Sequence, residues 1–243
     1  MKLAAIKKIL TRFMGSRKAL PPLASKEGLF EVNILPLKNI FLFPGGMLPI
    51  HIFEERYKAM ADDALKHHIP MAMSHAVSPQ VQPGMICGGG KVRLLEEFPD
   101  HRKNILVEGE VRYRIRKIVQ NEPFYKVMAE KVSDIPFASS HAEAESRFRI
   151  ETNIKRWIFT NPSIDDNLLN TIFIFDLPHQ LADFIGNHFL PTADLKRKLL
   201  EESDCAKRVA MVNLFLEDEI QKFVTVVQNN SNFVAAQSRS EMN

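Results

Sequence analysis

The sequence predicts an α+β protein, in which a twisted, partly closed β barrel is followed by an α-helical bundle. From Leu29 to about Ile135, apolar residues mostly recur with a period of two, which is typical of strands. After Pro136 the period becomes 3.6, which is typical of helices. The 243 residues, with 45% hydrophobic and 25% charged side chains, have the composition of a globular protein of one large or two small domains.

The β half begins with a strand at Leu29, where apolar and polar residues alternate. The segment after it contains Pro36, Pro44 and Pro49. Because proline cannot donate a hydrogen bond to a neighbouring strand, we expect these prolines at strand edges, turns or bulges. One helix is predicted from about Glu54 to His67. The remaining strands are expected at residues 91–98, 104–107, 111–117 and 124–132.

Three consecutive glycines, Gly88 to Gly90, precede Lys91 in the β half. A phosphate-binding loop would need a further glycine where this chain has Met85, and a Ser or Thr where it has Val92. The glycines therefore indicate a bulge or a close crossing of strands, where a missing Cβ lets two backbones approach.

The α half is predicted to contain five helices, each with an apolar stripe at helical spacing. Pro178 suits the first turn of the third helix, and Thr192 is a suitable N-cap for the fourth. Ser203 is the expected N-cap of the last helix, whose apolar stripe continues to Val227. The stripes are carried by residues 150–158, 164–175, 181–188, 195–200 and 209–227.

These patterns divide the chain into four segments. We expect a basic N-terminal extension, a β subdomain, a helical subdomain and a polar, disordered tail. Their predicted bounds are residues 1–27, 28–138, 139–228 and 229–243.

Several motifs occur along the chain in a characteristic order. Residues 35–57 read Leu-Pro-Leu, then Phe-Pro-Gly, then Leu-Pro-Ile-His-Ile-Phe-Glu-Glu-Arg-Tyr. Val107-Glu108-Gly109 with Tyr113-Arg114-Ile115 follows, and then Leu181–Ile185 and Lys198–Glu201 in the helical half. Together the motifs resemble the N-terminal, substrate-binding domain of the Lon protease family, from about residue 29 to residue 227. Glu55 departs from the pattern, because relatives often have proline there.

The resemblance implies a PUA-like β pseudo-barrel, a C-terminal helical bundle and a non-catalytic activity in protein binding. We expect a stand-alone protein that lacks the ATPase and Ser-Lys protease modules of Lon. No histidine or cysteine cluster has the spacing of metal ligands, so neither a metal nor another cofactor is expected. Cys87 and Cys205 are predicted to be reduced, buried thiols of a cytoplasmic protein.

The turn-rich segment supplies five candidate polypeptide-binding residues: Phe43, Met47, His51, Phe53 and Tyr57. Exposed apolar side chains of this kind would recognise unfolded polypeptides, whereas the alternative interpretation is that they fill the two small cores. The expected partners are client polypeptides and a separate ATP-dependent protease, for which the protein would act as an adaptor.

The alternative function is nucleic-acid binding. Alternation places Arg112, Arg114 and Arg116 on one face of a strand, and PUA-like folds in other families bind RNA. The simpler interpretation is a solvated face of a half-buried sheet. Tyr113 falls on the opposite face, where it cannot stack on a base beside the arginines, and this disfavours nucleic acid.

Residues 1–20 combine six Lys and Arg with apolar residues at helical spacing. The pattern lacks the apolar core and cleavage site of a secretory signal. It is compatible with peripheral contact to an anionic membrane, with docking on a partner, or with an ordinary terminal helix. No apolar run in the sequence reaches the roughly 18–20 residues that a membrane-spanning helix needs.

Overall fold

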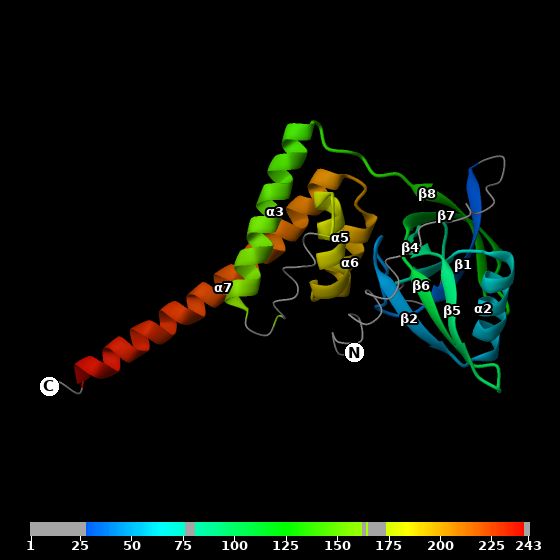
Figure 1. The fold of residues 1–243 in the computed structure, drawn as a ribbon, viewed down its shortest axis with the longest axis horizontal. Helices are drawn as coiled ribbons and strands as arrows, with labels where there is room; N and C mark the ends of the chain where they lie inside the picture. The colour runs from blue at the N-terminus through cyan, green and yellow to red at the C-terminus, as the bar shows by residue number, and fades with distance from the viewer. Residues whose placement is uncertain (1–27, 76–80, 162–163, 165–173, 241–243) are drawn as a thin grey trace.

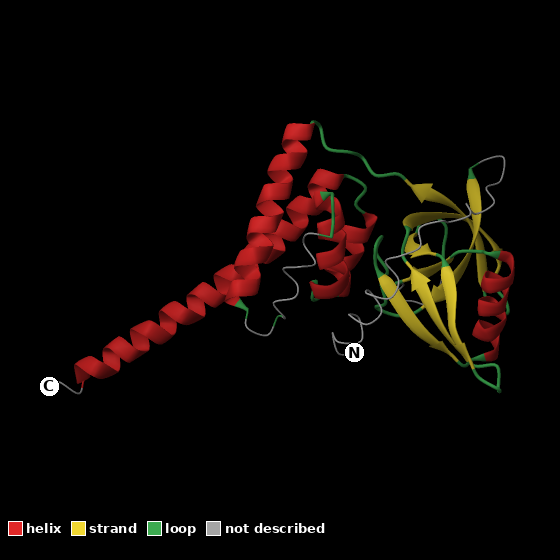
Figure 2. Ribbon diagram, in the orientation of Figure 1, coloured by secondary structure: helices red, strands yellow, loops and turns green. Residues whose placement is uncertain are grey.

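The structure is a computed structural model and describes residues 28–75, 81–161, 164 and 174–240. The strands gather with helix α2 at one end of the molecule and α3, α5, α6 and α7 at the other, joined by the segment between β8 and α3 (Figures 1 and 2). The predicted α+β class, with a β barrel followed by helices, is confirmed.

Five strands close into a barrel. Strand β1 pairs with β3 in parallel and with β8 in antiparallel orientation, and the other pairs, β3–β4, β4–β7 and β7–β8, are antiparallel. In barrel order the strands are β1 (Leu29–Pro36), β3 (Met71–Ser74), β4 (Ile86–Gly90), β7 (Val111–Gln120) and β8 (Tyr125–Val132).

The other three strands form a separate antiparallel sheet. Its order is β2 (Met47–Ile52), β6 (Lys103–Glu108) and β5 (Val92–Glu97), so β2 and β5 are edge strands of this sheet. Helix α2 (Glu55–His67) follows β2 directly, as predicted. The three prolines lie at the end of β1, in the turn before β2, and in the edge strand β2, as expected for a residue that cannot donate to a ladder.

The glycine run lies in β4, where backbones cross closely. A Cβ atom on Gly88 would lie 1.5 Å from the carbonyl oxygen of Leu42, and one on Gly89 would lie 2.3 Å from that of Met71. Both distances are far below van der Waals contact, so the predicted close crossing is confirmed. The segment before β2 can therefore pass directly over the barrel wall.

The helical half contains α3 (Ser140–Thr160), α5 (Pro178–Phe189), α6 (Ala193–Glu201) and α7 (Cys205–Ser240). Pro178 is in the first turn of α5, and the Thr192 side chain accepts a hydrogen bond from the backbone N–H of Leu195, as predicted. The helix expected over residues 164–175 and the N-terminal extension fall almost entirely outside the described residues.

Two predictions about α7 are wrong. Ser203 is not its cap, because the carboxylate of Asp204 accepts the hydrogen bond from the backbone N–H of Lys207, at 3.1 Å. The helix also does not end near Val227 but continues through the expected polar tail to Ser240. The chain contains neither glycine nor proline after residue 191, so nothing in its sequence breaks the helix.

The two halves are packed together. Phe41 and Phe43 come from the segment before β2, yet both are buried in the core of the helical half. Residue Ile135 forms a bridge with Asp204, which directly precedes α7. The barrel and the three-stranded sheet have their own cores, one of which includes Leu35, Ile52 and Ile105. Contacts between the halves thus begin at the segment that leads into β2.

Candidate functional site

The candidate site is the outer face of edge strand β2. Side chains alternate along a strand, so Met47, His51 and the residue after the strand, Phe53, point to the same side. Ile50 and Ile52 point to the other side, where they pack on the core of the sheet. Three of the five residues predicted from sequence therefore share one surface, which we refer to as the β2 surface.

A row of polar contacts crosses the three strands at His51. The His51 Nδ1 atom lies 2.8 Å from Asn104 Oδ1, and Asn104 Nδ2 donates to Glu96 Oε2 at 2.9 Å. Because Asn104 Oδ1 can only accept, His51 Nδ1 is the donor in this contact. The row fixes the orientation of the His51 ring, with one residue contributed by each strand of the sheet.

Aromatic rings surround His51. Its ring is stacked with Phe53 at a centroid distance of 6.1 Å and meets Phe98 edge-on at 6.0 Å. The Arg102 guanidinium lies 5.4 Å from the centre of the Phe98 ring. Phe53 nevertheless remains 60% exposed, so a large apolar side chain is presented to solvent on an ordered aromatic support.

A small cavity of about 70 Å³ lies beside Phe53. Its walls are mostly apolar and come from the end of β1, from β2 and from the start of α2: Leu35, Leu37, Ile50, His51, Ile52, Phe53, Glu54 and Tyr57. Since a water molecule needs roughly 10–15 Å³ of such space, the cavity has room for an aliphatic side chain. An exposed ring beside an apolar cavity is a combination that suits apolar ligands.

Phe43 and Tyr57 do not belong to this surface. Phe43 is completely buried in the helical core, and its backbone N–H donates to Asn187 Oδ1 at 3.4 Å. Tyr57 is buried in the core beneath the three-stranded sheet, where burial raises the pKa of its phenol. The expected exposure of these two side chains is therefore wrong, because Phe43 packs into the helical core and Tyr57 lies on the buried face of α2.

Sequence reasoning missed Glu96, Phe98 and Asn104. They reach the β2 surface only through the pairing of β2 with β6 and of β6 with β5. Strands β2, β5 and β6 are separated in sequence by up to half the length of the β subdomain. In addition, a register shift between Leu94 and Glu96 changes which side chains of β5 face outward. The alternation within β2 was the only local signal available.

The three arginines of the alternative hypothesis do not form a common exposed face. Arg112 is buried and forms an ion pair with Asp183 of α5, and its Nε donates to the carbonyl oxygen of Leu200 at 3.0 Å. Arg114 and Arg116 both pair with Glu130 of the neighbouring strand, at 3.3 and 2.6 Å. The predicted shared face is therefore wrong for Arg112, because the helical half covers that part of β7.

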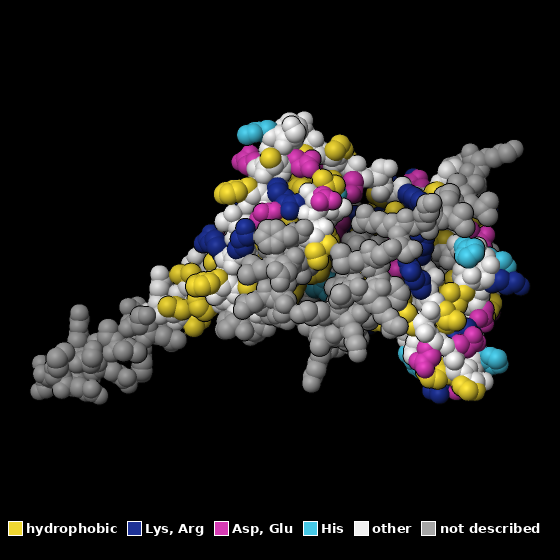
Figure 3. Space-filling view, viewed as in Figure 1, with side chains coloured by type: hydrophobic (Ala, Val, Ile, Leu, Met, Phe, Trp, Pro, Cys, Tyr) yellow, Lys and Arg dark blue, Asp and Glu magenta, His cyan; other side chains and the backbone are white. Residues whose placement is uncertain are grey.

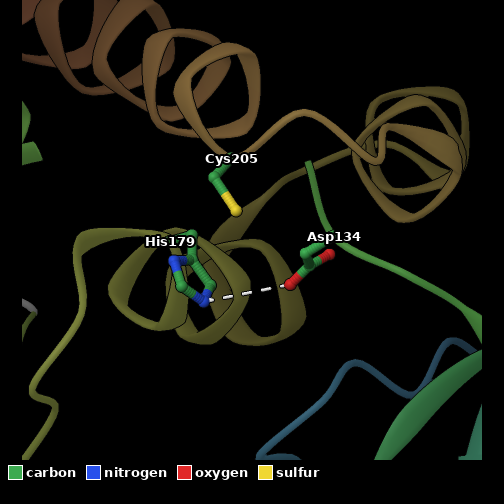
Figure 4. A group of neighbouring side chains, drawn as sticks. All are labelled: Asp134, His179 and Cys205. Carbon is green, nitrogen blue, oxygen red and sulfur yellow. Dashed lines mark ion pairs between the residues drawn. The ribbon is translucent and has the colours of Figure 1, made fainter. Parts of the chain in front are cut away.

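Among the described residues, Asp134, His179 and Cys205 form one group whose geometry could hold a metal ion (Figure 4). The Asp134 carboxylate is already paired with the Arg208 guanidinium, at 2.6 and 2.9 Å. Although burial opposes it, this pairing lowers the pKa of Asp134, while burial raises the pKa of Cys205. The Arg112 guanidinium also lies near this carboxylate, at 3.6 Å. Two positively charged groups thus already pair with Asp134, which disfavours a metal ion at this group.

The fold and the site thus describe a β barrel joined to a helical half, with an ordered aromatic surface on one edge strand. Residues 31–218 match the family described as the ATP-dependent protease La (LON) substrate-binding domain. The chain belongs to this family. As its description says, the matched domain is the substrate-binding part of those proteins.

Relatives in this family include full Lon proteases. The chain is 28% identical to the Lon protease of Azospirillum brasilense over 206 residues, and 29% identical to Lon protease 1 of Myxococcus xanthus over 209 residues. These matches cover 80% and 82% of this chain, and the chain spans about a quarter of the length of either relative (25%).

Two solved structures have the same fold. The N-terminal domain of the Mycobacterium avium complex Lon protease superposes with a TM-score of 0.59 at 18% identity, covering 79% of this chain and 98% of that one. A Lon N-terminal domain protein from Xanthomonas campestris gives a TM-score of 0.51 at 16% identity, covering 75% and 96%. In the part of the chain that the structure describes, no helix is long and apolar enough to span a membrane.

Proposed function

We propose that this protein binds exposed apolar segments of client polypeptides on the β2 surface, through Met47, His51 and Phe53. The observation that carries the proposal is the 60% exposed ring of Phe53, held by His51 beside an apolar cavity. Large apolar side chains on ordered supports are the usual anchors of binding surfaces. Membership of a substrate-binding family supports the same role.

Delivery of the bound client to a separate ATP-dependent protease is the finer part of this proposal. Its support is the family alone, because the matched relatives are Lon proteases and the match covers about a quarter of their length. A pull-down of such a protease by the full chain, with and without a bound unfolded client, measures this step separately from client binding.

The binding step is tested by equilibrium titration of the protein into a labelled, permanently unfolded polypeptide. We expect Phe53→Asp to weaken binding by roughly 10-fold or more, because loss of a central apolar anchor typically costs 1–3 kcal/mol. The matched control is Phe148→Asp on α3, whose side chain is 73% exposed and lies in the other half of the molecule. Circular dichroism of both variants confirms that the fold is intact.

Salt concentration separates this function from polyanion binding. Salt does not weaken apolar contacts, so we expect the affinity for the unfolded polypeptide to be at least as high at high salt as at low salt. Binding through Arg114 and Arg116 would instead weaken steeply with salt. Unchanged binding by Phe53→Asp, or a loss in Phe148→Asp alone, would contradict the β2 surface as the site.

A further inference from the structure

Strand β2 pairs with β6 on one side, and its other side is an edge of the three-stranded sheet. The backbone N–H of Gly109 donates to the carbonyl oxygen of Gly46 at 2.8 Å, at the beginning of the ladder between these strands. Backbone groups alternate between the two sides of an antiparallel strand, so every second residue after Gly46 bonds to β6. The residues that direct their N–H and C=O groups away from β6 are therefore Met47, Pro49 and His51.

We refer to the outward backbone groups of these three residues as the open edge. In the part of the chain that the structure describes, no hydrogen bond to them is found. Three carbonyl oxygens and the N–H groups of Met47 and His51 are thus available to a partner. Pro49 has no N–H, and it is tolerated in the strand because its nitrogen faces away from β6.

The other edge strand of this sheet, β5, has features that obstruct pairing with a further strand. It contains three charged residues, and its pairing with β6 shifts register between Leu94 and Glu96. Charges and bulges keep natural edge strands from pairing with other chains. Figure 3 shows acidic, basic and hydrophobic side chains mixed over this part of the sheet. Strand β2 has a continuous register with β6 and contains no Asp, Glu, Lys or Arg, so Pro49 is its one feature of this kind.

The apolar cavity beside Phe53 borders the open edge. Its walls include Leu35 and Leu37 from the end of β1 and the turn after it, together with Ile50 of β2, and no residue of β6 lines it. In a strand added to β2, side chains would alternate between the two faces of the sheet. Those on one face would lie beside Met47 and Phe53, and those on the other face would lie beside Ile50, next to the cavity.

We propose that the client polypeptide binds to the open edge as an additional, extended β-strand; this inference rests on the proposed function and specifies its binding mode. Hydrogen bonds to Met47, Pro49 and His51 recognise the backbone, which every polypeptide has, and alternate side chains contact Phe53 and the cavity. Clients of different sequence can therefore bind in one way. The preferred client is an unfolded segment with alternating apolar residues and without proline.

A second copy of this chain is a poorer occupant of the open edge. A client strand meets one Pro49 and lacks one donor. In a pair of β2 strands each copy contributes its own Pro49, so two donors are lost. Each lost donor leaves a carbonyl oxygen of the opposite strand without its hydrogen bond, which weakens the pair.

Amide hydrogen exchange, read by NMR on the full chain, tests the binding mode with a permanently unfolded polypeptide as the probe. In the free protein we expect fast exchange at Met47 and His51, and slow exchange at Leu48 and Ile50, whose N–H groups donate to β6. Saturating polypeptide should slow exchange at Met47 and His51 by roughly 10-fold or more, because their N–H groups then donate to the added strand.

A substitution that adds a donor tests the same edge. Pro49→Ala supplies one more outward N–H, so we expect it to increase the affinity for the polypeptide by roughly 3- to 5-fold. The matched control is Pro83→Ala, an exposed proline in the turn before β4, which should leave the affinity unchanged.

A second pair of variants removes a donor. His51→Ala and His51→Pro both remove the imidazole, but only His51→Pro also removes the outward N–H. We expect His51→Pro to bind the polypeptide at least about 5-fold more weakly than His51→Ala. Circular dichroism verifies that both variants fold, and Pro49→Ala tests the open edge without them.

The possible outcomes separate this inference from the proposed function. Polypeptide binding with unchanged exchange at Met47 and His51, and no increase in affinity for Pro49→Ala, would overturn strand addition but leave the β2 surface as the client site. Slow exchange at both amides in the free protein would also overturn it, and would assign the edge to a second copy if the protection depends on concentration, or to another segment of this chain if it does not. Absence of polypeptide binding would overturn both proposals.

Discussion

Arg112 shows how the role of a single residue depends on what covers its strand. Its guanidinium is buried between the halves, where it contacts Asp183 and the carbonyl oxygen of Leu200. Arg208 of α7 lies beside the same carboxylate, at 3.5 Å, and also pairs with Asp134. Two arginines and two aspartates thus join β7, the linker after β8, α5 and α7.

Removal of one partner from this network leaves a buried charge without compensation. We expect Asp183→Ala to lower the free energy of unfolding by about 3–5 kcal/mol, measured by urea denaturation. The double variant Asp183→Leu with Arg112→Met should recover most of this loss, because no buried charge is then left without a partner. Arg116→Ala serves as the control, since its ion pair with Glu130 is exposed, and is expected to change stability by less than about 1 kcal/mol. A loss no larger than that of Arg116→Ala would contradict the structural role.

At this scale, sequence reasoning identified which residues alternate but not which face is covered. The alternation of Arg112 and Tyr113 is present, yet both side chains are buried, one against the helical half and one in the barrel. The contact that buries Arg112 comes from Asp183, far away in the sequence. Local periodicity carries no information about such a contact.

Among the elements, β4 is the strand whose sequence is most tightly constrained. Its glycines allow the segment that contains Leu42 to pass against the barrel wall. A side chain at Gly88 would displace backbone rather than a flexible side chain, and backbone is held by hydrogen bonds that cannot easily move. The run Gly88 to Gly90 is therefore explained by packing and not by phosphate binding.

The effect of this close crossing on stability can be measured by adding one methyl group at Gly88. We expect Gly88→Ala to destabilise the protein by at least about 3 kcal/mol, because the strand or the crossing segment must shift. Gly84→Ala is the matched control: it has a φ of +89° but no atom within 4 Å of the added Cβ, so only conformational strain of about 1–2 kcal/mol is expected. Equal losses in the two variants, measured by thermal or urea unfolding, would contradict the close crossing.

Element types and order were predictable from sequence, because periodicity and turn residues are local. The ends of the helices and strands were less predictable. Helix α7 continues well past its last strongly apolar stretch, because polar Asn and Ser residues do not by themselves stop a helix that is already formed. The partition of strands between a five-stranded barrel and a three-stranded sheet was not predictable. Strand pairing brings together segments that are distant in sequence, so it depends on how the whole chain folds.

For the molecule as a whole, the main feature is the interlocking of its two halves. Phe43 comes from the β half but is completely buried in the helical core, and Arg112 comes from the barrel but pairs with a helix. Neither half therefore has all of its buried contacts when it stands alone. The boundary expected near residue 139 lies within the stretch between the end of β8 and the start of α3, but this division of the chain cuts through a shared core.

We expect the halves to unfold together. The single tryptophan, Trp157, is buried in the helical core and reports that half by fluorescence, while amide hydrogen exchange of the β4 and β7 strands reports the barrel. The two probes should give the same urea midpoint, and Phe43→Ala should lower both midpoints. Two separate midpoints in the unmodified protein would show that the interface is too weak to couple the halves.

The position of Phe43 also bears on the client binding that we propose for the β2 surface. The turn that this residue anchors leads directly into β2, so the strand that carries His51 begins at a point held by the helical half. Thermodynamic linkage then requires that a polypeptide which prefers the ordered β2 strand also strengthens the contact between the halves, by the same free energy in both directions. A partner that bound only the helices would in this way change how tightly a client is held on the distant sheet.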